Sequence, residues 1–196
     1  MSNIEIIKSI RNKTGLPLKD INKAIEAVGT DSEERIITYL REQGVLKQQA
    51  RQDRDTSNGG IFAYSHDGRL GVLVELRCET DFVARSNSFQ ELGNDIALHI
   101  AAFQPKFISP ENADVEFINK ELDIARKQLE LEGKPQDKIE MILHGKKKKI
   151  LEEFSLLTQP FIKDTKITVA QAIAQLVQVT GEKIEITRFT IFSLNN

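Results

Sequence analysis

The sequence is poor in the residues that build covalent or metal-held sites. It has one cysteine among 196 residues, Cys78, and no tryptophan. One cysteine excludes an intrachain disulfide and a zinc site built from cysteine pairs. The three histidines, His66, His99 and His144, lie far apart and lack companions at a catalytic spacing. We therefore expect no cofactor, no resident metal and no enzyme activity, with an enzyme whose groups converge only in the fold as a minor alternative.

Long apolar runs and a strong charge of one sign are also missing. No apolar stretch approaches the roughly 20 residues that cross a bilayer. The formal net charge is -2, whereas general nucleic-acid binders are clearly basic. Residues 1–5 resemble neither a secretory signal nor a transit peptide. We therefore expect no membrane partner, no direct nucleic-acid partner and a cytoplasmic protein, either bacterial or made inside a plastid or similar organelle.

Glycine is present, but not in the spacing of a phosphate-binding loop. The sequence has neither the Walker pattern nor the dinucleotide-binding pattern of glycines, so we expect no nucleotide site. Instead, Gly59 and Gly60 end a polar, charged stretch over 48–60, which indicates a linker.

On either side of that stretch, the apolar residues predict an α+β protein of two parts. Residues 1–47 fit three short helices with apolar stripes, a bundle too small to be more than marginally stable alone. Such a bundle suits docking better than catalysis. Residues 61–196 fit an α+β core with a small antiparallel sheet of about three strands and several helices. We expect this second part to serve also as a dimerisation domain.

The last predicted strand is apolar on both faces. Ile184 and Ile186 share one face, Phe189 and Ile191 share the other, and Phe192 is again in phase with Ile184. This pattern indicates either a β-bulge or a strand buried on both sides. Because a chain this short has little else to cover a second face, we expect Phe189, Ile191 and Phe192 to contribute to an interface with a second copy.

The most informative stretch is a strand that ends abruptly. Apolar side chains alternate from Val72 to Cys78, and the alternation stops at Thr80-Asp81. Thr and Asp commonly cap helices, so we expect a strand-to-helix corner that presents Phe82 on a rigid support. In the simpler alternative, which spacing alone favours, Phe82 and Val83 are the first buried residues of the next helix.

Three segments resemble one known family. Residues 75–85, Glu-Leu-Arg-Cys-Glu-Thr-Asp-Phe-Val-Ala-Arg, resemble the central signature of the translation elongation factor Ts family. Residues 10–25 resemble its first signature, and residues 156–164 resemble a third stretch. The chain departs from the family at Arg77, where Asn is usual, at Pro17, where a small residue is usual, and at Asn22, where Lys is usual. Its length is that of the short, single-core, homodimeric form.

The resemblance implies a guanine-nucleotide exchange factor that promotes GDP release from elongation factor Tu. The implied exchange residues are Thr80, Asp81, Phe82 and Val83. Phe82 would be a wedge beside the partner's nucleotide, and Asp81 would act on the partner's magnesium. The resemblance also implies that the N-terminal bundle is of the ubiquitin-associated type and docks on the GTPase. The implied docking residues are Thr14, Gly15, Leu16, Leu18 and Lys23. Burial inside the bundle is the alternative for Leu16 and Leu18, and for Leu18 it is an equal one.

Two alternatives stay open at this point. The chain fits a non-catalytic, ubiquitin-associated-like adaptor whose second part is a passive dimerisation domain, in which case residues 1–50 alone bind the partner. The basic run at Lys146–Lys149 fits a solvated helix face, or a contact with RNA or an acidic protein surface.

Overall fold

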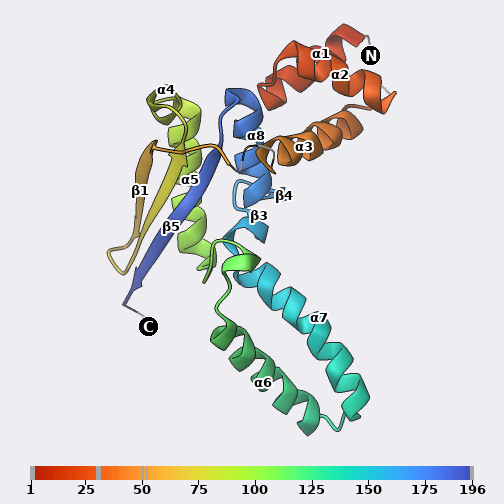
Figure 1. Cartoon of the computed structure of the whole chain (residues 1–196), viewed down its shortest axis with the longest axis vertical. Helices are drawn as coiled ribbons and strands as arrows, with labels where there is room; N and C mark the ends of the chain where they lie inside the picture. Colours follow the sequence, from red (N-terminus) through yellow and green to blue (C-terminus); the bar gives the residue numbers. More distant parts are fainter. Residues whose placement is uncertain (1–2, 30–31, 50, 52, 195–196) are drawn as a thin grey trace.

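The computed structural model describes residues 3–29, 32–49, 51 and 53–194, and these residues form an α+β fold (Figure 1). In chain order the helices are α1 (Asn3–Thr14), α2 (Leu18–Val28), α3 (Glu33–Gln49), α4 (Asp81–Ala84), α5 (Asn87–Phe103), α6 (Val115–Leu131), α7 (Gln136–Phe154) and α8 (Val169–Thr180). The strands are β1 (Asn58–His66), β2 (Leu70–Cys78), β3 (Pro160–Phe161), β4 (Asp164–Thr168) and β5 (Ile184–Ser193), with short 3-10 turns at Pro110–Asn112 and Leu156–Thr158. The predicted α+β class is confirmed. Among the described helices, none combines the length and apolar character needed to cross a membrane.

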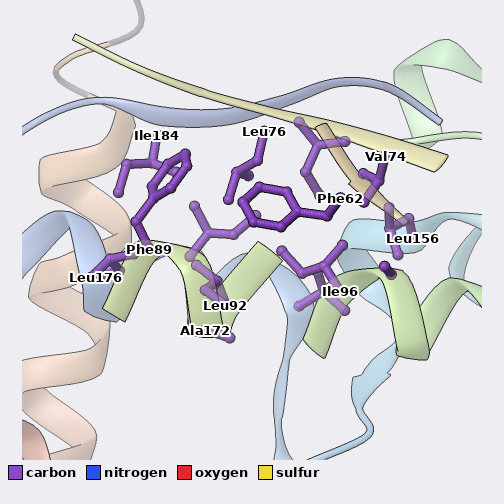
Figure 2. Close-up of a cluster of buried hydrophobic side chains, with 14 of the residues drawn as sticks. Phe62, Val74, Leu76, Phe89, Leu92, Ile96, Leu156, Ala172, Leu176 and Ile184 are labelled. Atoms are coloured by element: carbon purple, nitrogen blue, oxygen red, sulfur yellow. The ribbon is translucent and has the colours of Figure 1, made fainter. Parts of the chain in front are cut away.

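A three-stranded antiparallel sheet, in the order β1-β2-β5, organises the larger part of the chain. Its inner face packs on α5 and α8 (Figure 1). Figure 2 shows Phe62 and Leu76 of the sheet directed toward Phe89 and Ile96 of α5. This core is closed and apolar, so the strand-to-helix corner after β2 stands on a well-packed base. The small three-stranded sheet expected from the sequence is confirmed.

A bulge explains the apolar pattern of β5. Glu75 of β2 pairs with Arg188, whereas the next residue, Leu76, pairs with Ile186, so Thr187 is an extra residue on β5. The extra residue reverses the faces that follow it. Phe189 therefore joins Ile186 against the core. Of the two explanations left open by the sequence, the bulge is the one found.

The N-terminal helices have their own apolar cluster and pack on α8 through α3 (Figure 1). Gln178 of α8 donates from Nε2 to the carbonyl oxygen of Leu40 at 2.5 Å. Gly44 makes this approach possible, because a Cβ at Gly44 would lie 2.8 Å from Cδ of Gln178. Helix α3 runs on past this glycine to Gln49, two residues beyond the expected end of the bundle at residue 47. The ubiquitin-associated type and the domain boundaries stay predictions.

Helices α6 and α7 form a hairpin that projects away from the sheet (Figure 1). Their shared apolar cluster is small, consisting of Ala125, Leu129, Ile139 and Leu143. The Lys146–Lys149 run lies inside α7, where Lys147, Lys148 and Lys149 are exposed. Lys148 lies 3.8 Å from Glu152 one turn further on. Within the described chain, this run therefore lies on a solvated helix.

Candidate functional site

The corner between β2 and α4 is capped by Thr80. Its backbone is extended, with φ -123°, and its Oγ1 accepts from the backbone N of Val83 at 3.4 Å. The Thr80 carbonyl accepts from the backbone N of Ala84 at 3.2 Å. A threonine oxygen therefore satisfies an N–H group that a helix start leaves free. The expected strand-to-helix corner is present.

Phe82 projects from this corner into solvent. Its side chain is 84% exposed, while Ala84 is buried and Val83 packs against the core. The alternative in which Phe82 is a core residue is therefore wrong. Asp81 is partly exposed beside it and forms an ion pair with Arg85 at 3.3 Å. Apolar side chains of this size are usually buried, so an exposed one on an ordered turn is available for a partner.

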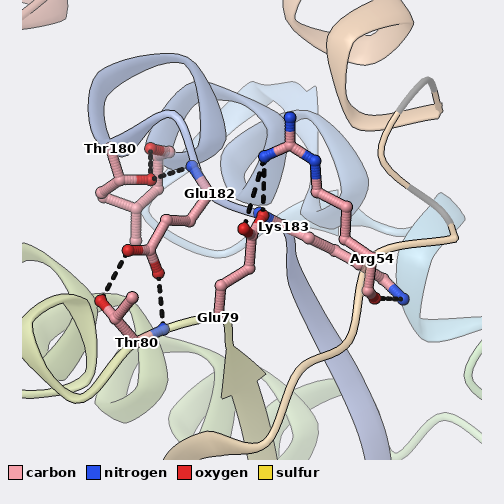
Figure 3. Close-up of polar contacts among 7 residues, drawn as sticks. Arg54, Glu79, Thr80, Thr180, Glu182 and Lys183 are labelled. Carbon is pink, nitrogen blue, oxygen red and sulfur yellow. Dashed lines mark hydrogen bonds and ion pairs between the residues drawn. The ribbon is translucent and has the colours of Figure 1, made fainter.

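The base of the corner is held by residues about a hundred positions further along the chain (Figure 3). Glu182 Oε1 accepts from the Thr80 hydroxyl at 2.6 Å, and its Oε2 accepts from the Thr80 backbone N at 3.0 Å. Reciprocally, Glu79 Oε1 accepts from the backbone N of Lys183 at 2.6 Å. Arg54, from the segment before β1, donates to the same Glu79 oxygen at 3.1 Å. The corner is thus joined both to the end of α8 and to the segment before the sheet.

The surroundings of the corner shift the pKa values of Glu79 and Cys78. Burial opposes ionisation of Glu79, but the hydrogen bond from Lys183 and the Arg54 guanidinium outweigh it and hold the pKa of Glu79 below its ordinary value. Burial, and next the negative charge of Glu182, raise the pKa of the Cys78 thiol to about 11. Cys78 is therefore protonated at neutral pH and packs as a small apolar residue rather than acting as a nucleophile.

The residues expected to dock the partner lie at the end of α1 (Thr14), on the loop that follows it and on α2. Gly15 has the left-handed φ of 66° that ends α1, and Thr14 donates from Oγ1 to the carbonyl of Ile10 at 2.7 Å. Leu16 is 3% exposed and packs inside the three-helix cluster, whereas Leu18 is 45% exposed. Lys23 is also exposed, on α2. Leu18, at the start of α2, is therefore available as an apolar contact, whereas Leu16 is buried and supports the loop from within instead of contacting a partner.

The chemistry expected of a core histidine is found at His99. Its Nε2 bonds Gln159 Oε1 at 2.9 Å, and its Nδ1 accepts from the backbone N of Ile162 at 3.3 Å. Burial lowers the pKa of His99, although the bond to Gln159 opposes this. Both ring nitrogens of this buried histidine therefore have hydrogen-bond partners. Among the described residues, no three or more His, Cys, Asp or Glu side chains cluster in a way that could hold a metal ion.

The corner that carries Phe82 and the loop that contains Gly15 do not form one pocket. Both lie near the end of α8. A Cβ at Gly15 would lie 3.9 Å from Cγ2 of Val179, and Glu182 bonds Thr80. Sequence reasoning missed Glu182, Lys183 and Arg54 as supports of the corner. No local signal marks them, because their partners lie 25 to 104 residues away along the chain.

Comparison with known proteins gives the same family as the segments that frame this site. The family model described as "Elongation factor TS" matches residues 7–196. The chain is 43% identical over 189 residues to elongation factor Ts of Solidesulfovibrio magneticus, covering 96% of this chain and 94% of the relative. It is 40% identical over 195 residues to elongation factor Ts of Thermosipho melanesiensis, covering 99% of each. The chain therefore belongs to the elongation factor Ts family of translation elongation factors.

Proposed function

We propose that this protein is a guanine-nucleotide exchange factor that promotes GDP release from elongation factor Tu. The observation that carries the proposal is Phe82, an 84% exposed aromatic on a capped and doubly anchored corner. Phe82 enters an apolar gap in the GTPase domain, and Asp81 beside it disturbs the surroundings of the partner's magnesium. The protein itself holds neither nucleotide nor metal in this mechanism. We further propose the bacterial cytoplasm as its setting, because the relatives that it matches come from bacteria.

The energetics follow from linkage. An exchange factor that binds nucleotide-free elongation factor Tu more tightly than the GDP form must weaken GDP binding by the same factor. The N-terminal bundle contributes affinity for both forms, through Leu18 and Lys23 on its surface. Phe82 contributes only when its gap is open, so its binding energy is directed to the state that has lost GDP. Anchoring by the bundle and wedging by Phe82 are therefore separable in kinetics.

We also propose that the protein works as a homodimer joined through the outer face of its sheet. Ile61, Leu73 and Phe192 are exposed there, Phe192 by 68%. Glu75, on the same face, is paired with Arg77 and Arg188. An apolar centre with internally paired charges suits a second copy of the same face. Because of the bulge, Phe189 and Ile191 support this face from the core side and only Phe192 of the expected trio lies on it.

The exchange proposal is tested by release of fluorescent GDP from elongation factor Tu in the presence of catalytic amounts of this protein. We expect fast release, and a loss of about 30-fold or more in Phe82→Ala, because truncating a buried interface aromatic costs about 2 kcal/mol or more. Leu131→Ala is the matched control, since Leu131 is 90% exposed at the end of α6, far along the chain from the corner.

The outcomes separate the alternatives. Fast release that survives Phe82→Ala would keep the exchange function and remove the wedge assignment. Tight binding to elongation factor Tu without any acceleration of release would refute the exchange function and favour the adaptor, in which residues 1–50 bind and Asp81-Phe82 is dispensable.

A further inference from the structure

Glu182 lies where α8 gives way to β5, and it bonds Thr80 across 102 positions of sequence (Figure 3). We propose that Glu182 is a positioning residue for nucleotide exchange: it fixes the Thr80 cap and thereby the direction in which Phe82 is presented. This inference rests on the exchange function proposed above. It adds a residue that hydrogen-bonds Thr80, two positions before the wedge, and that lies outside the segment carrying the family's central signature.

The chemistry of the contact is directional. At neutral pH a glutamate carboxylate accepts hydrogen bonds and has none to donate. The Thr80 hydroxyl must therefore give its hydrogen to Glu182 Oε1, at 2.6 Å, which leaves a lone pair for the backbone N of Val83. The other carboxylate oxygen accepts from the Thr80 backbone N at 3.0 Å. One side chain thus orients both polar groups of the cap, and bonds of this charge-assisted kind are the stronger ones.

Phe82 needs this support because α4, the short helix that carries it, has little stability of its own. Helix α4 contains four residues, and a helix of one turn has no stability in isolation. The far end of the turn is held by Gln90, whose Nε2 donates to the carbonyl of Ala84 at 2.8 Å. The near end is held by Glu182 through Thr80. Because the ring of Phe82 is exposed, its direction is set by the backbone at these two ends rather than by packing of the ring.

The end of α8, which precedes Glu182, also contacts the N-terminal bundle. Gln178 of α8 bonds the carbonyl of Leu40 in α3, and Val179 lies against the loop at Gly15. Helix α8 ends at Gly181, whose φ is 77°, and Glu182 follows immediately. The residues that contact the bundle and the corner, Gln178 and Glu182, are therefore four positions apart, at the end of α8 and just after it. Glu182 fixes the corner relative to the helix on which the bundle rests.

A double-mutant cycle with Phe82 tests the assignment. We would measure the saturated rate of GDP release from elongation factor Tu, and the concentration at half saturation, for Glu182→Ala, Phe82→Ala and the double variant. We expect Glu182→Ala to lower the saturated rate about tenfold, because it removes one to two charge-assisted hydrogen bonds. The concentration at half saturation should change little. In the Phe82→Ala background the same change should cause no further loss, because residues that act through one another are not additive.

Two further variants control for folding. Glu182→Gln keeps the shape and one accepting oxygen, so it should give an intermediate rate, and it replaces Glu182→Ala in the cycle if the alanine variant melts near the assay temperature. Glu185→Gln should keep the parent rate, because Glu185 bonds Thr56 and Lys183 rather than Thr80.

The results discriminate between the two proposals. If Glu182→Ala leaves the saturated rate unchanged, or lowers it by the same factor with and without Phe82, Glu182 does not position the wedge and the inference fails while the exchange function stands. If the parent protein does not accelerate release at all, the exchange function fails and the inference fails with it.

Discussion

Gly93→Ala should destabilise this protein even though it replaces glycine in a helix by the best helix former. Gly93 lies inside α5, opposite Phe62 of β1. A Cβ at Gly93 would lie 2.3 Å from Cε2 and 2.4 Å from Cδ2 of the Phe62 ring, whereas ordinary contacts are 3.4–4 Å. Phe62 is buried and its ring packs beside that of Phe89, with centroids 6.0 Å apart, so it has no free space into which to retreat.

The magnitude follows from two opposing terms. Helix propensity favours alanine by about 1 kcal/mol. Overpacking a closed core costs roughly 1–3 kcal/mol, and a clash of more than 1 Å with a buried ring belongs at the upper end of that range. We therefore expect a net loss of about 2 kcal/mol. In a chain of this size, such a loss lowers Tm by roughly 4–8 °C.

Gly145→Ala is the matched control. Gly145 also lies inside a helix, α7, but nothing lies within 4 Å of the Cβ that alanine would add. This change should raise stability by about 0.5–1 kcal/mol. Denaturant unfolding followed by circular dichroism measures both variants, and Phe62→Leu added to Gly93→Ala should recover part of the loss. Equal stabilisation by both alanines would refute the packing of β1 on α5 described above.

Two other predictions concern pH and assembly. The pKa of His99 is lowered in the fold, so below about pH 6.5 the unfolded chain binds a proton that the folded chain does not. The free energy of unfolding should therefore fall as the pH drops below about 6.5, and its slope against pH should be shallower in His99→Gln. An identical slope in both proteins would exclude His99 as its source. Phe192→Glu should convert the proposed dimer to a monomer in analytical ultracentrifugation, since it places a charge in the apolar centre of the sheet face; a parent protein that sediments as a monomer would contradict the dimer.

Local patterns predicted the parts of this fold whose causes are local. The alternation from Val72 to Cys78 gave the inner and outer faces of β2, because strand side chains alternate regardless of what covers them. Its interruption at Thr80 located the corner, since a side-chain cap acts within three residues. Exposure of Phe82 did not follow from spacing, which favoured burial; the resemblance to a family, not periodicity, pointed the other way.

Features set by distant partners were beyond the reach of such patterns. Gly44 resembles a helix end but lies inside α3, where it makes room for Gln178 of α8. The sequence 143–146 resembles a break after Leu143, yet α7 continues through it, because a glycine in a helix costs only about 1 kcal/mol and its neighbours favour helix. The bulge at Thr187 was one of two explanations for β5, and only the pairing with β2 decided between them.

Because Phe82 is exposed, the effect of removing its ring on exchange can be separated from an effect on stability. Substitutions of exposed residues that make no special structural contact usually change stability by less than about 0.5 kcal/mol. Thr80 and Ala84, which hold the turn, do so through backbone atoms and the threonine hydroxyl, and these remain when the Phe82 ring is removed. Phe82→Ala should therefore unfold at the same denaturant concentration as the parent. A loss of exchange at unchanged stability then reports a lost contact with the partner, whereas a loss accompanied by lower stability would mean that the ring supports the corner and that the wedge has not been isolated.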